Sequence, residues 1–139
     1  MKPSLFTRHP ASSRGFTLVE IMIVVAIIAL LAAIAVPGFL RARKRSQGVT
    51  VLTDLRLIDG AMDQYALEYN KGGNATIPIA AWKLYMKPGT RLYATNTNIF
   101  GDAYGDQTLG TLPPVPSKTW DNLMDVCDAS FWNPYVRGN

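Results

Sequence analysis

An uninterrupted run of apolar residues, IMIVVAIIALLAAIAV at positions 21–36, constrains this chain more than any other feature. As an α-helix the run would be about 24 Å long, and residues 16–40 would be about 37 Å long. A bilayer core is about 30 Å thick, so the run spans it only together with its flanks. The sequence therefore predicts an apolar rod joined to one small soluble domain, in a chain of 139 residues.

The first 15 residues, MKPSLFTRHPASSRG, are basic, contain two prolines and lack a helical apolar period. These properties indicate a targeting segment, 1–15, that is removed from the mature protein. An ordinary secretory signal is the alternative, because Ala33-Ile34-Ala35 resembles an A-x-A cleavage site. Against it, the run exceeds the usual apolar region of about 7–15 residues, and Glu20 lies inside the hydrophobic stretch.

The position of Glu20 needs a physical explanation, because placing a carboxylate within a membrane segment costs free energy. Such a residue is by default a candidate for a functional role. A cut between Gly15 and Phe16 would create a positive α-amine four residues before it. In a bundle of parallel helices, the amine of an incoming subunit would pair with Glu20 of a packed subunit and set the axial register. The alternative is that Glu20 only snorkels to the headgroups.

The segment Arg14-Gly15-Phe16-Thr17-Leu18-Val19-Glu20 resembles the processing site of type IV prepilins and of the pseudopilins of type II secretion. The resemblance implies that a membrane-embedded prepilin peptidase cuts after Gly15 and N-methylates Phe16. It implies that Glu20 is the assembly glutamate. It also identifies Pro37 with the family's helix-kinking proline, next to which Gly38 adds flexibility.

Beyond Pro37 the helix either ends or continues with a kink; the pattern of residues 41–70 favours continuation as an amphipathic helix. The breaker cluster 70–74 predicts its end near residue 70. One helical stripe of apolar residues should face a small domain, 71–139. The stripe comprises Leu52, Leu55, Ile58, Met62, Tyr65 and Tyr69.

The domain 71–139 should be α+β, with the long helix as one wall of its core. We expect a helix over 79–86, strands over 91–95 and 98–100, a turn over 101–106, an extended segment over 112–116, and a helix over 118–127 capped by Ser117. Inward-facing residues should be Trp82, Tyr85, Trp120, Leu123, Met124 and Cys127. Cys127 should be a buried thiol, and the tryptophans core residues rather than a stacking or sugar-binding surface.

The net charge of +4 comes from the leader and from RARKR at 41–45, and residues 46–139 are slightly acidic. This distribution argues against nucleic acid as a partner. The only histidine is His9 in the leader, and no phosphate loop or metal-spaced cluster is present, so we expect no enzyme. Asp102 and Asp106 are weak calcium candidates, because oxygen ligands in a loop suit that ion; otherwise no cofactor is expected.

The sequence thus predicts a structural subunit of a type IV pilus-like filament or a type II secretion pseudopilus. Its lone cysteine cannot form the disulfide usual in type IVa pilins, which favours a pseudopilin. The partners would be further copies, the prepilin peptidase, an inner-membrane assembly platform and membrane lipid. The alternative is a membrane-anchored extracytoplasmic binding module.

Counted alone, Lys and Arg near the ends of the run do not support a cytoplasmic N-terminus. We follow the motif and expect the leader inside and residues 41–139 outside. Residues 41–45 should meet lipid headgroups before assembly, and Asp54 or Asp59 of neighbouring copies afterwards.

Overall fold

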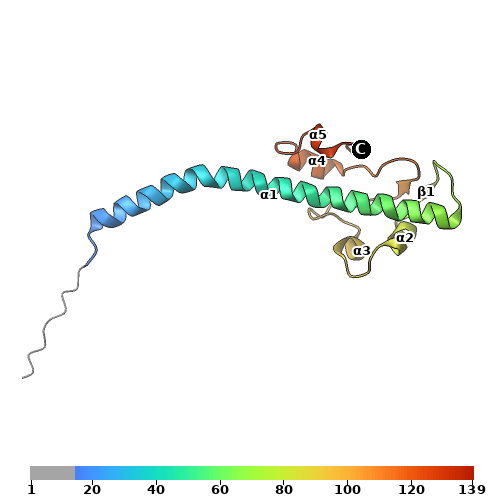
Figure 1. The fold of residues 1–139 in the computed structure, drawn as a ribbon, viewed down its shortest axis with the longest axis horizontal. Helices are drawn as coiled ribbons and strands as arrows, with labels where there is room; N and C mark the ends of the chain where they lie inside the picture. The colour runs from blue at the N-terminus through green and yellow to red at the C-terminus, as the bar shows by residue number, and fades with distance from the viewer. Residues whose placement is uncertain (1–14) are drawn as a thin grey trace, which may run out of the picture. The chain divides into compact units, whose positions relative to one another are not determined.

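The computed structural model describes residues 15–139, so the predictions for residues 1–14 concern a segment outside this range. The described chain divides into two compact units, 15–38 and Phe39–Asn139, which are treated separately below. Helix α1, Leu18–Tyr69, contains 52 residues and contributes to both units (Figure 1). The prediction of one long helix over about 16–70 is confirmed.

In the first unit every described residue is exposed, including all of the apolar run. This part of α1 is long and apolar enough to cross a membrane, by length and composition. Pro37 lies inside the helix, so the alternative in which the helix ends at Pro37 is wrong.

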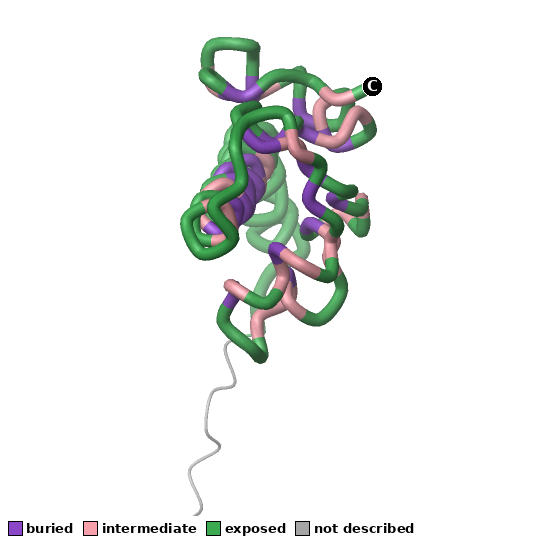
Figure 2. The backbone as a smooth tube through the Cα atoms, turned by 90° about the vertical axis from the view of Figure 1, so that its right-hand side faces the viewer, coloured by how far each residue is buried: buried purple, intermediate pink, exposed green. Residues whose placement is uncertain are grey.

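In the second unit α1 buries one face under the rest of the chain (Figure 2). Four residues of the predicted stripe, Leu52, Leu55, Ile58 and Met62, are buried, as expected. The buried face also includes Gly48, Val51 and Ala61, which are not part of the predicted stripe. Tyr65 is half-buried and Tyr69 is exposed, so the buried face fades before the helix ends.

The helix ends where the breaker cluster predicted. Asn70 and Asn74 both adopt positive φ, at 47° and 68°, a conformation that asparagine tolerates better than most residues. The Lys71 N–H donates to the Ala66 carbonyl at 3.0 Å, which satisfies one of the last carbonyls of the helix.

The rest of the second unit consists of short elements, and the sheet is minimal. Its two strands, β1 Thr76–Ile77 and β2 Gln107–Thr108, pair antiparallel with Thr76 opposite Thr108. In Figure 1, α2 and α3 lie on one side of the C-terminal part of α1, and α4 and α5 on the other. The fold is α+β, as predicted. The helices are α2 Ile79–Trp82, the 3-10 helix η1 Lys83–Tyr85, α3 Arg91–Thr95, α4 Ser117–Leu123 and α5 Ala129–Trp132.

Both strands predicted between residues 91 and 100 are wrong. Residues Arg91–Thr95 form helix α3, because the Thr90 hydroxyl caps it by accepting from the Tyr93 N–H at 3.2 Å. Residues 98–100 form a turn, because the Asn98 side-chain oxygen accepts from the N–H groups of Phe100 and Asp102. Local side-chain bonds to the backbone compete here with a strand ladder.

The helix predicted over 118–127 is shorter than expected. Pro116 occupies the N-cap position of α4, Ser117 makes no capping bond, and the helix ends at Leu123. Consequently Met124 is exposed rather than inward-facing. Cys127 is buried as predicted, and burial raises the pKa of its thiol.

The tryptophans behave mainly as core residues. Trp82 and Trp132 are fully buried, and Trp120 is half-buried and stacked on Trp132, with ring centroids 5.7 Å apart. The predicted aromatic core is therefore confirmed for two tryptophans and partly for the third. Little of this aromatic surface remains for stacking a ligand.

Candidate functional site

The start of α1 is closed by a reciprocal pair of contacts between Thr17 and Glu20. The Glu20 N–H donates to the Thr17 hydroxyl at 3.2 Å, and the Thr17 N–H donates to Glu20 Oε2 at 3.4 Å. This arrangement is a capping box, in which each side chain satisfies a backbone donor at the helix start. The second contact is at the long end of the hydrogen-bond range.

The capping box gives Glu20 a structural role that our sequence reasoning missed. The signal was present, because Thr17-Leu18-Val19-Glu20 has the S/T-x-x-E spacing of the motif. A helix N-terminus also favours a carboxylate in its first turn through the helix dipole. A carboxylate has about four acceptor positions, so one contact to Thr17 leaves room for a second donor.

Gly15 and Phe16, the predicted cleavage pair, directly precede the helix. Both are exposed, the Phe16 side chain to 79%, and neither belongs to α1. The peptide bond between them therefore lies in an accessible segment outside the helix. Arg14, the first residue of the motif, lies outside the described residues.

Pro37 and Gly38, the predicted kink, lie within α1. No heavy atom lies within 4 Å of the position that a Gly38 Cβ would occupy, counting neighbours outside the helix backbone. Proline inside a helix removes one backbone hydrogen bond. The kink itself stays a prediction.

The basic cluster 41–45 begins directly after Leu40 and is only partly neutralised. Lys44 Nζ pairs with Asp125 Oδ2 at 2.7 Å, which holds the pKa of Asp125 below its usual range. The Arg45 guanidinium lies over the Phe131 ring, 5.6 Å from its centroid. Arg41 and Arg43 are exposed and make no hydrogen bond or ion pair with any residue of 15–139.

The expectation that Asp54 would face a neighbouring copy is wrong. Asp54 is buried, and its Oδ2 accepts from Arg91 Nη2 at 2.6 Å and from the Tyr104 hydroxyl at 3.4 Å. Burial, and the carboxylate of Asp54 beside it, raise the pKa of Tyr104. The pair of Asp54 with Arg91 joins α1 to α3.

Asp59, the other acid expected to face a neighbour, is half-buried on the same helix. Partial burial and the nearby Asp63 carboxylate raise its pKa. Its role in assembly stays a prediction.

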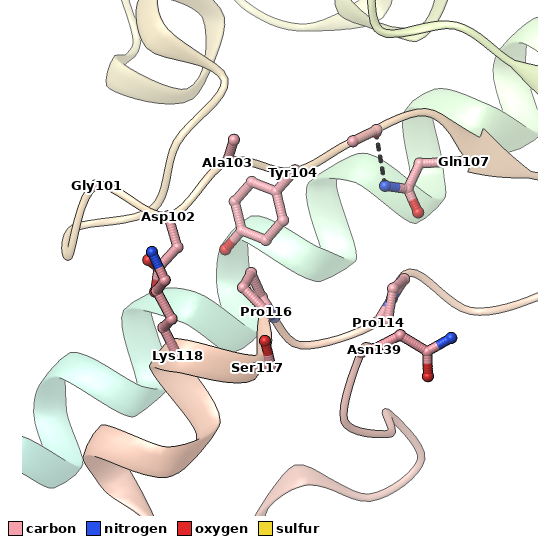
Figure 3. Close-up of a pocket in the computed structure, with 12 residues that line it drawn as sticks. Gly101, Asp102, Ala103, Tyr104, Gln107, Pro114, Pro116, Ser117, Lys118 and Asn139 are labelled. Atoms are coloured by element: carbon pink, nitrogen blue, oxygen red, sulfur yellow. Dashed lines mark hydrogen bonds between the residues drawn. The ribbon is translucent and has the colours of Figure 1, made fainter.

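The calcium candidates Asp102 and Asp106 are engaged in the fold. The Asp102 carboxylate accepts a hydrogen bond from the Thr119 hydroxyl, and Asp106 Oδ1 accepts from the Ile79 N–H at 2.9 Å. Over residues 15–139 no group of three or more His, Cys, Asp or Glu side chains is placed to hold a metal. Asp102 lines an open cleft of about 370 Å³ together with Tyr104 and Lys118 (Figure 3).

Comparison with known proteins points to the N-terminal segment. Residues 10–36 match the family model described as the prokaryotic N-terminal methylation motif, and this range contains Gly15, Phe16 and Glu20. The type IV major pilin protein PilA of Myxococcus xanthus is 42% identical over 65 residues, which are 47% of this chain and 30% of that protein. The type II secretion system core protein G of Klebsiella pneumoniae is 38% identical over 58 residues, covering 42% of this chain and 41% of that protein.

A longer but weaker match joins the chain to the prepilin peptidase-dependent protein D of Escherichia coli K12, which is 29% identical over 121 residues, 81% of this chain and 77% of that protein. The chain spans less than half the length of the first two relatives. No solved structure matches. The N-terminal part of the chain thus carries the prokaryotic N-terminal methylation motif and is similar to that of type IV pilins and type II secretion pseudopilins.

Proposed function

We propose that this chain is a structural subunit of a type IV pilus-like filament or type II secretion pseudopilus, assembled through the first part of α1. The observation that carries the proposal is the motif at residues 15–20, followed directly by a part of α1, up to Gly38, whose apolar residues are all exposed. Such a helix needs an apolar environment, because exposed apolar surface on this scale is unfavourable in water. Lipid supplies it before assembly, and further copies of the helix supply it afterwards.

Glu20 is then the residue that favours a defined register over loose aggregation. A prepilin peptidase cuts after Gly15, and the new α-amine of Phe16, which the same enzyme methylates, pairs with Glu20 of another copy. The contact to Thr17 is compatible with this pairing, because Glu20 Oε1 makes no hydrogen bond with a described residue. A buried pair of this kind sets register more than it adds stability.

In this proposal the chain is the substrate of the prepilin peptidase and is not itself an enzyme. We assign the chain no catalytic residue, no cofactor and no nucleic-acid partner. Its leader would be cytoplasmic and residues 41–139 extracytoplasmic, with an inner-membrane assembly platform as a further partner. Because Cys127 is buried, it is unsuited to a disulfide at the surface, which favours the pseudopilin alternative.

The mass of the protein isolated from cells tests the processing step. We expect the loss of residues 1–15 and the gain of one methyl group on Phe16. Protein that retains Met1, or that is cut after Ala35, would contradict the proposal. A silent periplasm-active reporter fused after Asn139 would contradict the orientation.

Three substitutions separate the capping role of Glu20 from its charge. Glu20→Gln keeps a capping side chain but removes the charge, so we expect processing to continue and filament assembly to fail. Thr17→Val removes the cap and keeps the charge, so assembly should persist with a modest loss. Asp121→Asn, an exposed acid of the second unit, is the matched control and should assemble normally.

Assembly by Glu20→Gln at the level of the unchanged protein would exclude the charge pairing. The competing function, a tethered binding module, predicts that all three variants behave alike. It has little support from the aromatic residues, because Trp82 and Trp132 are enclosed in the core.

A further inference from the structure

A cleft beside the basic cluster offers a binding site that the filament function leaves unused. It lies between the start of the second unit's part of α1 and the loop after α4, and has a volume of about 410 Å³. Its lining consists of Arg41, Ala42, Arg45, Asp125 and Val126. All of these residues belong to the second unit.

Two guanidinium groups face this cleft from one side of α1. Arg41 and Arg45 are four residues apart, which places them on the same helix face about one turn apart. A guanidinium carries several donors in a planar fork that matches phosphate oxygens. Among residues 15–139 neither arginine makes a hydrogen bond or a salt bridge, although Arg41 acts electrostatically on Asp125 and Arg45 lies over the Phe131 ring, so both forks retain free donors.

The acidic groups nearby are already engaged. Asp125 pairs with Lys44 at 2.7 Å, and Asp128 caps α5 by accepting from the Phe131 N–H at 3.1 Å. With Arg41, Lys44 and Arg45 set against Asp125 and Asp128, the surroundings of the cleft keep a net positive charge. An anion entering the cleft would therefore meet more positive than negative charge, and one of the two carboxylates is already paired with Lys44.

We propose that this cleft binds the phosphate of an anionic phospholipid headgroup through Arg41 and Arg45. The inference rests on the proposed membrane anchoring of the chain. Lipid is favoured over other phosphates because Arg41 follows the apolar Phe39 and Leu40 directly, and headgroups begin where the hydrocarbon region ends. The exposed Phe39 and Leu40 would contact the acyl chains of the same lipid.

Native mass spectrometry of the full chain in detergent, titrated with phosphatidylglycerol or phosphatidylcholine, tests the site. We expect the double variant Arg41→Gln/Arg45→Gln to lose about thirtyfold in affinity for phosphatidylglycerol and little for phosphatidylcholine. The matched control Arg43→Gln/Lys71→Gln removes the same charge outside the cleft lining and should stay within about twofold. Equal losses in both double variants would overturn the proposal, because they would indicate diffuse attraction.

Inorganic phosphate, added alone, distinguishes the source of the anion. Tight phosphate binding without any preference for phosphatidylglycerol would overturn the lipid assignment. Loss of self-association in the cleft variant, without loss of lipid binding, would assign the cleft to another copy of the chain and also overturn it.

Tryptophan emission of each variant establishes that the second unit remains folded, since all three tryptophans lie there. Processing after Gly15 is measured on the same samples. Failed processing with intact lipid selectivity would reject the filament function and leave the cleft standing.

Discussion

The two units of this chain use helix α1 in opposite ways. Before Phe39 every residue of the helix is exposed, whereas beyond Gly48 the same helix buries a continuous face. The second part is explained by its own domain, which encloses Leu55, Ile58 and Met62. The first part finds no partner within the described chain, so its sequence must be explained by what surrounds the molecule.

The difference teaches that apolar content alone does not locate a core. Leu30 and Leu55 are the same residue type in the same helix, yet Leu30 is 64% exposed and Leu55 is fully buried. For the second unit, stability should depend on the buried face. For the first, the same substitutions should alter association with lipid or other copies and leave the domain unchanged.

The sharpest test of this contrast compares Leu55→Ala with Leu30→Ala. Leu55→Ala should lower the free energy of unfolding of the second unit by about 3 kcal/mol, because it removes buried methyl groups and leaves a cavity. Leu30→Ala should change it by less than about 0.5 kcal/mol. Urea unfolding of the full chain in detergent, followed by tryptophan emission, measures both. If both variants lost the same free energy of unfolding, Leu30 would contribute to the stability of the second unit as much as Leu55 does.

A second test concerns the polar link between α1 and α3. Asp54→Asn should destabilise the second unit by about 2 kcal/mol, because it leaves Arg91 without its charged partner in a partly buried place. Asp121→Asn breaks the exposed pair with Arg137, whose side chains are 55% and 48% exposed, and should cost less than about 1 kcal/mol. The same unfolding experiment measures both; if Asp121→Asn cost as much as Asp54→Asn, the buried position of Asp54 would not matter.

The smallest expected effect distinguishes two glycines of α1. An added Cβ at Gly48 would lie 2.9 Å from Cys127 Sγ and 3.0 Å from the Phe131 ring, so Gly48→Ala should cost about 1 kcal/mol net of its higher helix propensity. Gly60 has no such neighbour within 4 Å, and Gly60→Ala should stabilise by up to about 1 kcal/mol. Thermal unfolding of both variants would show whether their effects on stability have opposite signs. If both variants were more stable than the unchanged protein, the side chains of Cys127 and Phe131 would be able to move aside for the added methyl group.

The elements that sequence reasoning located are those determined by neighbouring residues. The long helix, its end at Asn70–Asn74 and the buried stripe all follow from periodicity and breakers. Helix α3 was missed because its stability depends on a cap at Thr90 and on a pairing of Arg91 with Asp54, 37 positions away. The sequence around Arg91 contains no pattern that predicts its pairing with Asp54.

Part of the candidate site could also be predicted, because that part consists of residues close together in the sequence. The cleavage pair and Glu20 stand out in the sequence, and the capping partner Thr17 could have been identified from its spacing. The cleft at Arg41 and Arg45 could not, because its far wall comes from Asp125 and Val126. Contacts between residues that are far apart in the sequence cannot be predicted from the local sequence around either of them.

The position of the cap at Thr17 has a consequence for maturation. Both of its side chains lie on the C-terminal side of the bond between Gly15 and Phe16, so proteolysis would leave the first helical turn intact. The cap itself would therefore not have to re-form after the cut. In that case the new amino group would sit one residue before a helical turn that is already capped, so cleavage would change the charge at the helix start and leave its hydrogen bonding unchanged.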